Sequence, residues 1–280
     1  MLAVRHRSAL LSLVLLASAA GPPLAGAPLG AQPSDTSTVS TAPLFTARDA
    51  IWAVVFTGTS IALFQFDEKI HRWVQRPGIQ DDELLADASR IANYANENRL
   101  MLAGLAAYGI GKLAGKPNAA DIGFHVFEAV GVSTVLNTAV RGALGRRRPY
   151  ATEPIDAFAF DGWEGFSDFD FRAFPSIHAS ANFSAAAALT AEVRRRWPGA
   201  TWWVGIASYG LATLPTLSRL HQGRHWASDL VMGGFVGTLT GLKIVQYHHS
   251  HPRNVIDRIF LHATPVAGAG RAGLVVRATF

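Results

Sequence analysis

Long apolar stretches with helical spacing are the feature that most limits what this chain can fold into. The first, Ala50–Phe66, carries no charged side chain along its length. Apolar residues that recur three and four positions apart indicate helices, whereas exposed strands would show strict alternation. We therefore predict helices over Ala50–Phe66, Arg99–Leu113, Ile122–Leu144, His178–Arg194, Trp202–Leu217 and Trp226–Tyr247.

The fold class that follows is all-α. We expect residues 49–250 to form a six-helix bundle, in which the amphipathic stretch Asp81–Asn96 is a connector. Charged residues make up 16 % of the chain, against about 25 % in typical soluble proteins. Such a composition suits helices whose outer faces meet lipid or other protein.

The C-terminal segment, residues 251–280, has a different pattern. Its last residues alternate apolar with other side chains, which predicts a strand. One or two strands cannot close a barrel, so we expect a short β-like tail that forms a hairpin. The alternating positions are Leu274, Val276, Ala278 and Phe280.

The N-terminal segment has the pattern of an export signal. Arg5 and Arg7 precede the apolar run Ser8–Ala20, and a stretch of small residues follows. We expect a signal peptide over residues 1–31 and a flexible linker over 32–48. Cleavage within 17–19 and an uncleaved anchor are alternatives. The protein is then exported to the cell envelope, where it is either membrane-associated or periplasmic.

Composition excludes several kinds of site. The chain has no cysteine, which excludes disulfides, cysteine-ligated metals and thiol nucleophiles. Its formal net charge of +5 favours acidic partners such as phosphates, nucleic acid or anionic lipid. We expect His248, His249 and His251 to belong to a solvated polar tail, and we expect no metal site.

Three polar segments lie at the ends of predicted helices, namely Arg141–Pro149, Pro175–His178 and Ser218–Asp229. Each segment on its own has a common structural explanation. A basic run often ends an apolar helix in solvent, a serine often caps a helix, and a His and an Asp four residues apart often form a surface pair. The occurrence of all three in one chain is what suggests a site.

Removal of a phosphate without a metal needs cations, a nucleophile and an acid. Arg141 and Arg148 are seven residues apart, so on one helix face both could reach the same pocket. Ser176 and the amide of Ile177 lie where a helix begins, and helix N-termini bind anions. His178 follows directly and can touch an anion bound there.

The third segment supplies the remaining groups. His225 and Asp229 share a helix face, so the carboxylate can fix the tautomer of His225 and raise its nucleophilicity. Arg219 lies on the preceding turn and adds a further guanidinium. By contrast, Arg146 and Arg147 have no such role and are expected at the surface or against lipid head groups.

These segments resemble the signature of the type 2 phosphatidic acid phosphatase and vanadium haloperoxidase superfamily, which reads Lys-x6-Arg-Pro, Pro-Ser-Gly-His and Ser-Arg-x5-His-x3-Asp. The resemblance implies a phosphohistidine on His225, oriented by Asp229, and His178 as the acid that releases the alcohol. Arg148, Arg219 and the residue at 141 would hold the phosphate. Two positions depart from the signature, because Arg141 replaces Lys and Ile177 replaces Gly.

The function expected from the sequence is a metal-independent phosphatase that acts on a phosphomonoester or pyrophosphate. Its substrate is a phosphorylated lipid or a small phosphate ester, with a membrane and no nucleic acid as partner. No cofactor is expected. One alternative is a haloperoxidase that uses vanadate. Another is a non-catalytic envelope protein that keeps the fold, because Ile177 would be strained if this position requires a positive φ.

The stretch between the first two motifs is rich in aromatic and acidic residues. It runs from Tyr150 to Phe174 and includes Trp163. We expect a loop that either packs its rings on the bundle or forms a lid and apolar wall for a lipid tail.

Overall fold

The computed structural model describes residues 43–251, 254–261, 263–268 and 271–276. The predicted signal peptide, 1–31, lies outside these residues, as does most of the predicted linker. The last two linker residues, Ala47 and Arg48, are already helical. Apart from a C-terminal hairpin, the regular elements of the described chain are helices, and the all-α fold is confirmed.

The long helices follow the predicted apolar stretches and extend most of them. Short helices occur at the turns, and α4 forms most of the predicted connector. The long helices are α2 (Ala47–Val74), α5 (Glu97–Leu113), α6 (Pro117–Leu144), α8 (Ile177–Arg196), α9 (Thr201–His221) and α10 (Ala227–Ser250). The short ones are α3 (Pro77–Gln80), α4 (Glu83–Ala92), α7 (Glu164–Ser167) and α11 (Val255–Phe260).

Local sequence explains where several helices begin. Thr46 caps α2 in a capping box with Asp49, and Asn96 caps α5 by accepting a hydrogen bond from Arg99 N. Pro117 opens α6 at a position where the missing N–H costs nothing. These signals fix helix starts independently of tertiary contacts.

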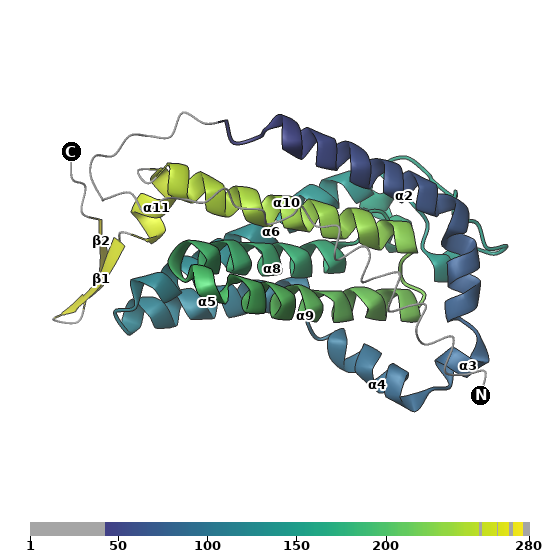
Figure 1. Cartoon of the computed structure of the whole chain (residues 1–280), viewed down its shortest axis with the longest axis horizontal. Helices are drawn as coiled ribbons and strands as arrows, with labels where there is room; N and C mark the ends of the chain where they lie inside the picture. The colour runs from purple at the N-terminus through teal and green to yellow at the C-terminus, as the bar shows by residue number, and fades with distance from the viewer. Residues whose placement is uncertain (1–42, 252–253, 262, 269–270, 277–280) are drawn as a thin grey trace.

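Helix α8 lies at the centre of the bundle, with α6, α9 and α10 packed around it (Figure 1). Its small side chains allow close approach, and most of them are buried. On α10, a Cβ at Gly237 would lie 2.1 Å from the carbonyl oxygen of Ser180. Only glycine permits this contact, so the spacing of α8 and α10 depends on it.

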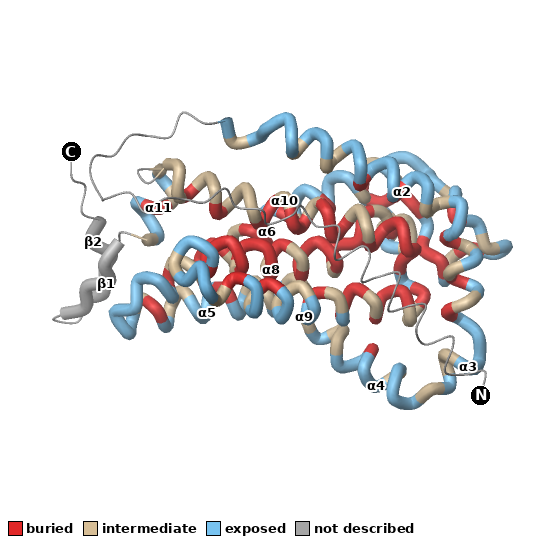
Figure 2. The backbone as a smooth tube through the Cα atoms, in the orientation of Figure 1, coloured by how far each residue is buried: buried red, intermediate tan, exposed pale blue. Residues whose placement is uncertain are grey.

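The outer helices contain many exposed residues (Figure 2), and large apolar residues are among them. On α9, Trp202 and Trp203 are 74 % and 77 % exposed, and α2 exposes Ile51 and Val54. Among the described residues, three helices are long and apolar enough to cross a membrane, namely α2, α6 and α10.

The C-terminal segment returns as two antiparallel strands, β1 (Ala263–Gly268) and β2 (Arg271–Val276), paired from Ala263 with Val276 to Gly268 with Arg271. The end of the predicted strand, 277–280, lies outside the described residues. The prediction of a solvated tail is wrong for His248, which is buried because α10 continues past it to Ser250 and α11 folds back against it.

Candidate active site

The three predicted segments meet at one end of the bundle. Helices α6 and α9 end there, and α8 and α10 begin there, because consecutive long helices run in opposite directions (Figure 1). Segments that are far apart in the sequence thus place their polar side chains together.

The second segment forms the N-terminus of α8. Ser176 is the N-cap and its hydroxyl accepts a hydrogen bond from Ala179 N at 3.4 Å. Ile177 is the first helical residue and is buried. Among non-glycine residues in the described chain, only Trp163 has a positive φ. The backbone strain considered for an isoleucine at this position is therefore not present.

The backbone of the first segment differs from the continuous helix that we expected. Helix α6 ends at Leu144, and Gly145 turns the chain in the left-handed conformation, with φ 59° and ψ 49°. Arg148 lies beyond the helix in extended backbone, with φ −74° and ψ 151°. The prediction that Arg141 and Arg148 share a helix face is wrong, because the glycine cap ends the helix between them.

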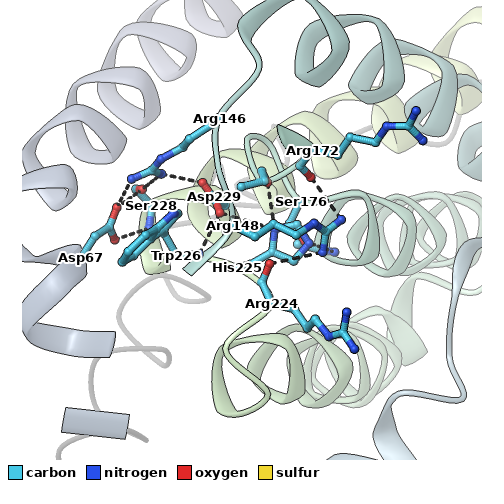
Figure 3. Close-up of polar contacts among 12 residues, drawn as sticks. Asp67, Arg146, Arg148, Arg172, Ser176, Arg224, His225, Trp226, Ser228 and Asp229 are labelled. Carbon is cyan, nitrogen blue, oxygen red and sulfur yellow. Dashed lines mark hydrogen bonds and ion pairs between the residues drawn. The ribbon is translucent and has the colours of Figure 1, made fainter. Parts of the chain in front are cut away.

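The side chain of Arg148 is nearly fully buried among carbonyl groups (Figure 3). Its Nη1 donates to Arg224 O and its Nη2 to Arg172 O, each at 3.3 Å. Its guanidinium also lies 4.2 Å from the ring centroid of Phe169. These contacts fix the orientation of the guanidinium.

His225 is buried and is held through its Nδ1 atom. Nδ1 lies 2.8 Å from the carbonyl oxygen of Ala173 and 3.4 Å from Oδ2 of Asp229. The expected role of Asp229, which is to orient the imidazole of His225, is thus shared with the carbonyl of Ala173, because this carbonyl is the nearer acceptor. With the proton on Nδ1, the lone pair of the imidazole is on Nε2.

Burial and the positive charges at this end of the bundle lower the pKa values of both His178 and His225. Burial, together with the charges of Arg219, His225, Arg148 and Arg141, lowers the pKa of His178 to about 3. Burial, with Arg148 and Arg219 next in effect, holds the pKa of His225 well below its usual value. The arginines predicted from separate segments therefore lie within electrostatic range of both imidazoles, an arrangement that attracts an anion.

The predicted connector also contributes to this end of the bundle. Arg219 Nη1 donates to Asn93 Oδ1 at 2.7 Å, just after α4. His178 Nδ1 lies 3.8 Å from a carboxylate oxygen of Glu97, at the start of α5. In the described chain, the Nε atoms of Arg141 and Arg219 are buried and have no hydrogen-bond partner. Both guanidiniums thus retain donors that an anionic ligand could use.

A buried charge network behind His225 was missed by the sequence analysis (Figure 3). Arg146 is fully buried, and its guanidinium bridges Asp229 Oδ1 at 2.5 Å and Asp67 Oδ2 at 2.8 Å. Asp67, on α2, also accepts from the backbone N of Ser228 at 3.0 Å. The prediction of a surface position is wrong for Arg146, because two buried carboxylates surround it.

The sequence offers only a weak signal for this network. Arg146 is one of three consecutive arginines, and nothing in the run separates it from the exposed Arg147. Asp67 directly follows the charge-free stretch of α2. This position is the one sequence feature that could have identified Asp67 as a functional residue.

The aromatic loop both packs on the bundle and exposes rings. Phe158, Phe160 and Phe174 lie 5.5–6.0 Å, between ring centroids, from Phe64 of α2. Trp163 is 72 % exposed. The expected packing on the bundle is therefore present, while the lid for a lipid tail stays a prediction.

Comparisons with known proteins match part of the chain. Residues 123–253 match the family model described as the PAP2 superfamily. The match covers 131 of the 280 residues, so this part of the chain is similar to the PAP2 superfamily. The matched residues include every residue that we predicted for the site, from Arg141 to Asp229.

A curated protein and a solved structure are also similar to this chain. A lipid A 1-phosphatase of Porphyromonas gingivalis is 36 % identical over 70 residues, which are 25 % of this chain and 15 % of that protein. The chain thus matches only a small part of that relative's length. The crystal structure of a transmembrane PAP2 type phosphatidylglycerolphosphate phosphatase from Bacillus subtilis matches with a TM-score of 0.37 and 17 % identity, over 69 % of this chain and 98 % of that one.

Proposed function

We propose that this protein is a phosphatase that hydrolyses a phosphomonoester or pyrophosphate of a lipid through a phosphohistidine on His225. The observation that carries the proposal is the setting of His225. Its Nδ1 is held by the carbonyl of Ala173 and by Asp229, while Arg148, Arg219 and Arg141 lie within electrostatic range.

The first step forms a bond from Nε2 of His225 to phosphorus and breaks the bond to the alcohol oxygen. Protonated His178 gives its proton to that oxygen as it leaves. The arginines neutralise the phosphoryl oxygens as charge develops on them. The carbonyl of Ala173 and the carboxylate of Asp229 stabilise the imidazole as it becomes positive.

The second step returns the enzyme to its starting state. Water attacks the phosphohistidine, the N–P bond breaks, and His178 accepts the proton released by the water. In the structure, burial and the neighbouring cations keep His178 neutral, since its pKa is lowered to about 3. A bound phosphate offsets these charges, so substrate binding itself supports protonation of His178.

A lipid substrate and a membrane location are supported by the surface of the protein. The outer helices expose large apolar side chains, and three helices are long and apolar enough to span a bilayer. The aromatic loop beside Arg148 adds an exposed apolar wall at the site. The relative from Porphyromonas gingivalis is itself a lipid phosphatase. We propose an exported, membrane-associated protein on this basis and on the N-terminal pattern.

The decisive experiment measures phosphate release by the full chain in detergent micelles. The panel contains phosphatidic acid, phosphatidylglycerol phosphate, a phosphorylated lipid A, a prenyl pyrophosphate and a water-soluble phosphomonoester. We expect turnover of at least one lipid, inhibition by vanadate, and a loss of roughly 10³-fold or more in His225→Ala. Full activity in His225→Ala would overturn the mechanism.

The same preparation tests the alternative functions. Oxidation of halide by peroxide in the presence of vanadate, with no phosphate release, would identify a haloperoxidase. Phosphate binding without release from any substrate would identify a non-catalytic protein. Radioactive phosphate retained on wild-type protein after acid-free denaturation, and absent from His225→Ala, would support the phosphohistidine directly.

A further inference from the structure

A second cluster of buried histidines and carboxylates lies at the end of the bundle opposite His225. Along α10, His248 is nineteen residues from Asp229, or about 28 Å at the rise of an α-helix. Four helices, α6, α8, α10 and α11, contribute to the cluster. Its members are His125, Glu128, Glu192, His248, His249 and Asp257.

His125 has the properties of a metal ligand. Its ring is 2 % exposed, and Nδ1 lies 2.5 Å from Oε1 of Glu192. Its Nε2 is buried and has no hydrogen-bond partner in the described residues. A buried polar atom without a partner calls for an explanation, and an ion is one of the usual ones.

The nearest groups to His125 can complete a coordination site. A ring nitrogen of His125, one of His248 and a carboxylate oxygen of Asp257 all lie within 4.8 Å of one another, and all three residues are buried. The rings of His125 and His248 are 4.3 Å apart between centroids. Nε2 of His248 lies 2.6 Å from Glu128, while Nδ1 faces Asp257.

We propose that Nε2 of His125, Nδ1 of His248 and a carboxylate oxygen of Asp257 bind a divalent transition metal ion, with Zn²⁺ as the expected metal. Two imidazoles and a carboxylate are a ligand set typical of zinc. Ligand histidines usually donate their other ring N–H to a carboxylate. Here Glu192 stands in that position for His125 and Glu128 for His248.

A second trio, formed by His125, Glu192 and His249, also has its ligand atoms within 4.8 Å of one another. In that trio, Glu192 already contacts Arg196 through its second carboxylate oxygen. A metal there would compete with the guanidinium for Glu192. In the trio with Asp257, the described partners of the carboxylate are His248, which is itself a proposed ligand, and the side-chain amide of Asn254. No guanidinium competes for Asp257 among these partners, so the metal is assigned there.

The metal would join α11 to the bundle. His125 belongs to α6, His248 to α10 and Asp257 to α11, which has only six residues. So short a helix buries little surface of its own. Coordination by Asp257 would hold α11, and the hairpin that follows it, against the end of the bundle. The role is structural, far from the proposed chemistry at His225.

The test uses the full chain, purified in detergent with an affinity tag that contains no histidine. After incubation with ZnSO₄ and gel filtration, elemental analysis should find about one zinc per chain. The variants His125→Ala and Asp257→Asn should lose this zinc. The matched control His251→Ala should keep it, because His251 contacts Ser250 and Tyr247 rather than the cluster.

Two further readouts separate metal binding from a loss of folding. Co²⁺ should give the absorption of a tetrahedral site in wild type and not in Asp257→Asn, whose retention volume should remain unchanged. Glu192→Gln should weaken zinc binding by roughly 10–100-fold without abolishing it.

Wild type without stoichiometric zinc would overturn the proposal, in favour of an ion-pair network. Loss of zinc in His249→Ala with retention in Asp257→Asn would overturn the assignment of the ligands. The outcome is independent of the phosphatase proposal, because His225→Ala should bind zinc as wild type does, and His125→Ala leaves the residues around His225 in place.

Discussion

At the scale of single residues, the candidate site consists of the buried His225 and a second buried group that supports it. His225 is held by Ala173 and Asp229, and Asp229 is held in turn by Arg146. Arg146 also pairs with Asp67 of α2, on a different part of the bundle. The position of His225, the proposed nucleophile, therefore depends on Arg146, which contacts Asp229.

Asp67→Asn tests this dependence. The amide keeps the shape of Asp67 but removes its negative charge from the network. Asp229 is then the remaining anionic partner of Arg146, so the position of Asp229 relative to His225 changes. We expect kcat to fall roughly 10-fold, equivalent to about 1.4 kcal/mol, with KM nearly unchanged, because the substrate contacts are intact. An equal rise of KM, or no change in kcat, would contradict a positioning role.

Arg146→Met makes a larger change. It leaves two buried carboxylates without their shared cation, and breaking such a pair costs about 3–5 kcal/mol. We expect a clear loss of thermal stability in detergent, measured as the fraction that remains in the supernatant after heating. Arg147→Met is the matched control, because Arg147 is exposed, and it should leave stability unchanged.

The pH dependence of vanadate inhibition tests the electrostatics of His178. In the free site the pKa of His178 is lowered to about 3, and a bound oxyanion raises it. The anion therefore binds more tightly to the protonated form, so affinity should increase as pH falls below the raised pKa, down to the free value of about 3. Above the raised pKa, His178 is neutral with or without the anion and contributes no pH dependence. Vanadate inhibition constants measured from about pH 5 to about pH 9 should show this pH dependence in wild type. In His178→Ala, the part of the pH dependence that is due to His178 should be lost.

At the scale of elements, the ends of helices place the site. The cap at Ser176 places the start of α8 beside Asp229, and the glycine cap of α6 directs the chain to Arg148. A Cβ at Gly145 would lie 1.6 Å from the carbonyl oxygen of Asp161, which belongs to the aromatic loop. One glycine thus fixes both the end of α6 and the position of that loop.

Gly145→Ala should lower both stability and activity. Gly115→Ala is the control, since Gly115 has a φ of 63° but no neighbouring atom within 4 Å of the added Cβ. The control should cost about 1–2 kcal/mol for the left-handed backbone. Gly145→Ala should cost clearly more and reduce phosphate release, and equal melting temperatures of the two variants would contradict the importance of the clash.

At the scale of the whole molecule, burial is concentrated on α8 while the outer helices present apolar side chains to the surroundings. We therefore expect the protein to remain in the membrane pellet after extraction with alkaline carbonate, with a peripheral protein of the same cells as control. Release into the supernatant would contradict insertion and would leave only a peripheral association.

The sequence by itself determined the long helices and the set of candidate site residues, because both depend on local patterns. Periodic apolar residues predicted the long helices near their observed positions, and the spacing of the three polar segments predicted the residues from Arg141 to Asp229. The family signature requires only the order and spacing of these residues, which a linear sequence contains.

Only the tertiary structure decided which charges are buried and what they contact. Arg146 and Arg147 are equivalent in the sequence, yet one bridges Asp67 and Asp229 while the other is exposed. His248 belongs to a polar-looking end of α10, yet it is enclosed by Glu128 and Asp257. The physical reason is that burial of a charge depends on partners that are distant along the chain, and only the packing of helices brings those partners together.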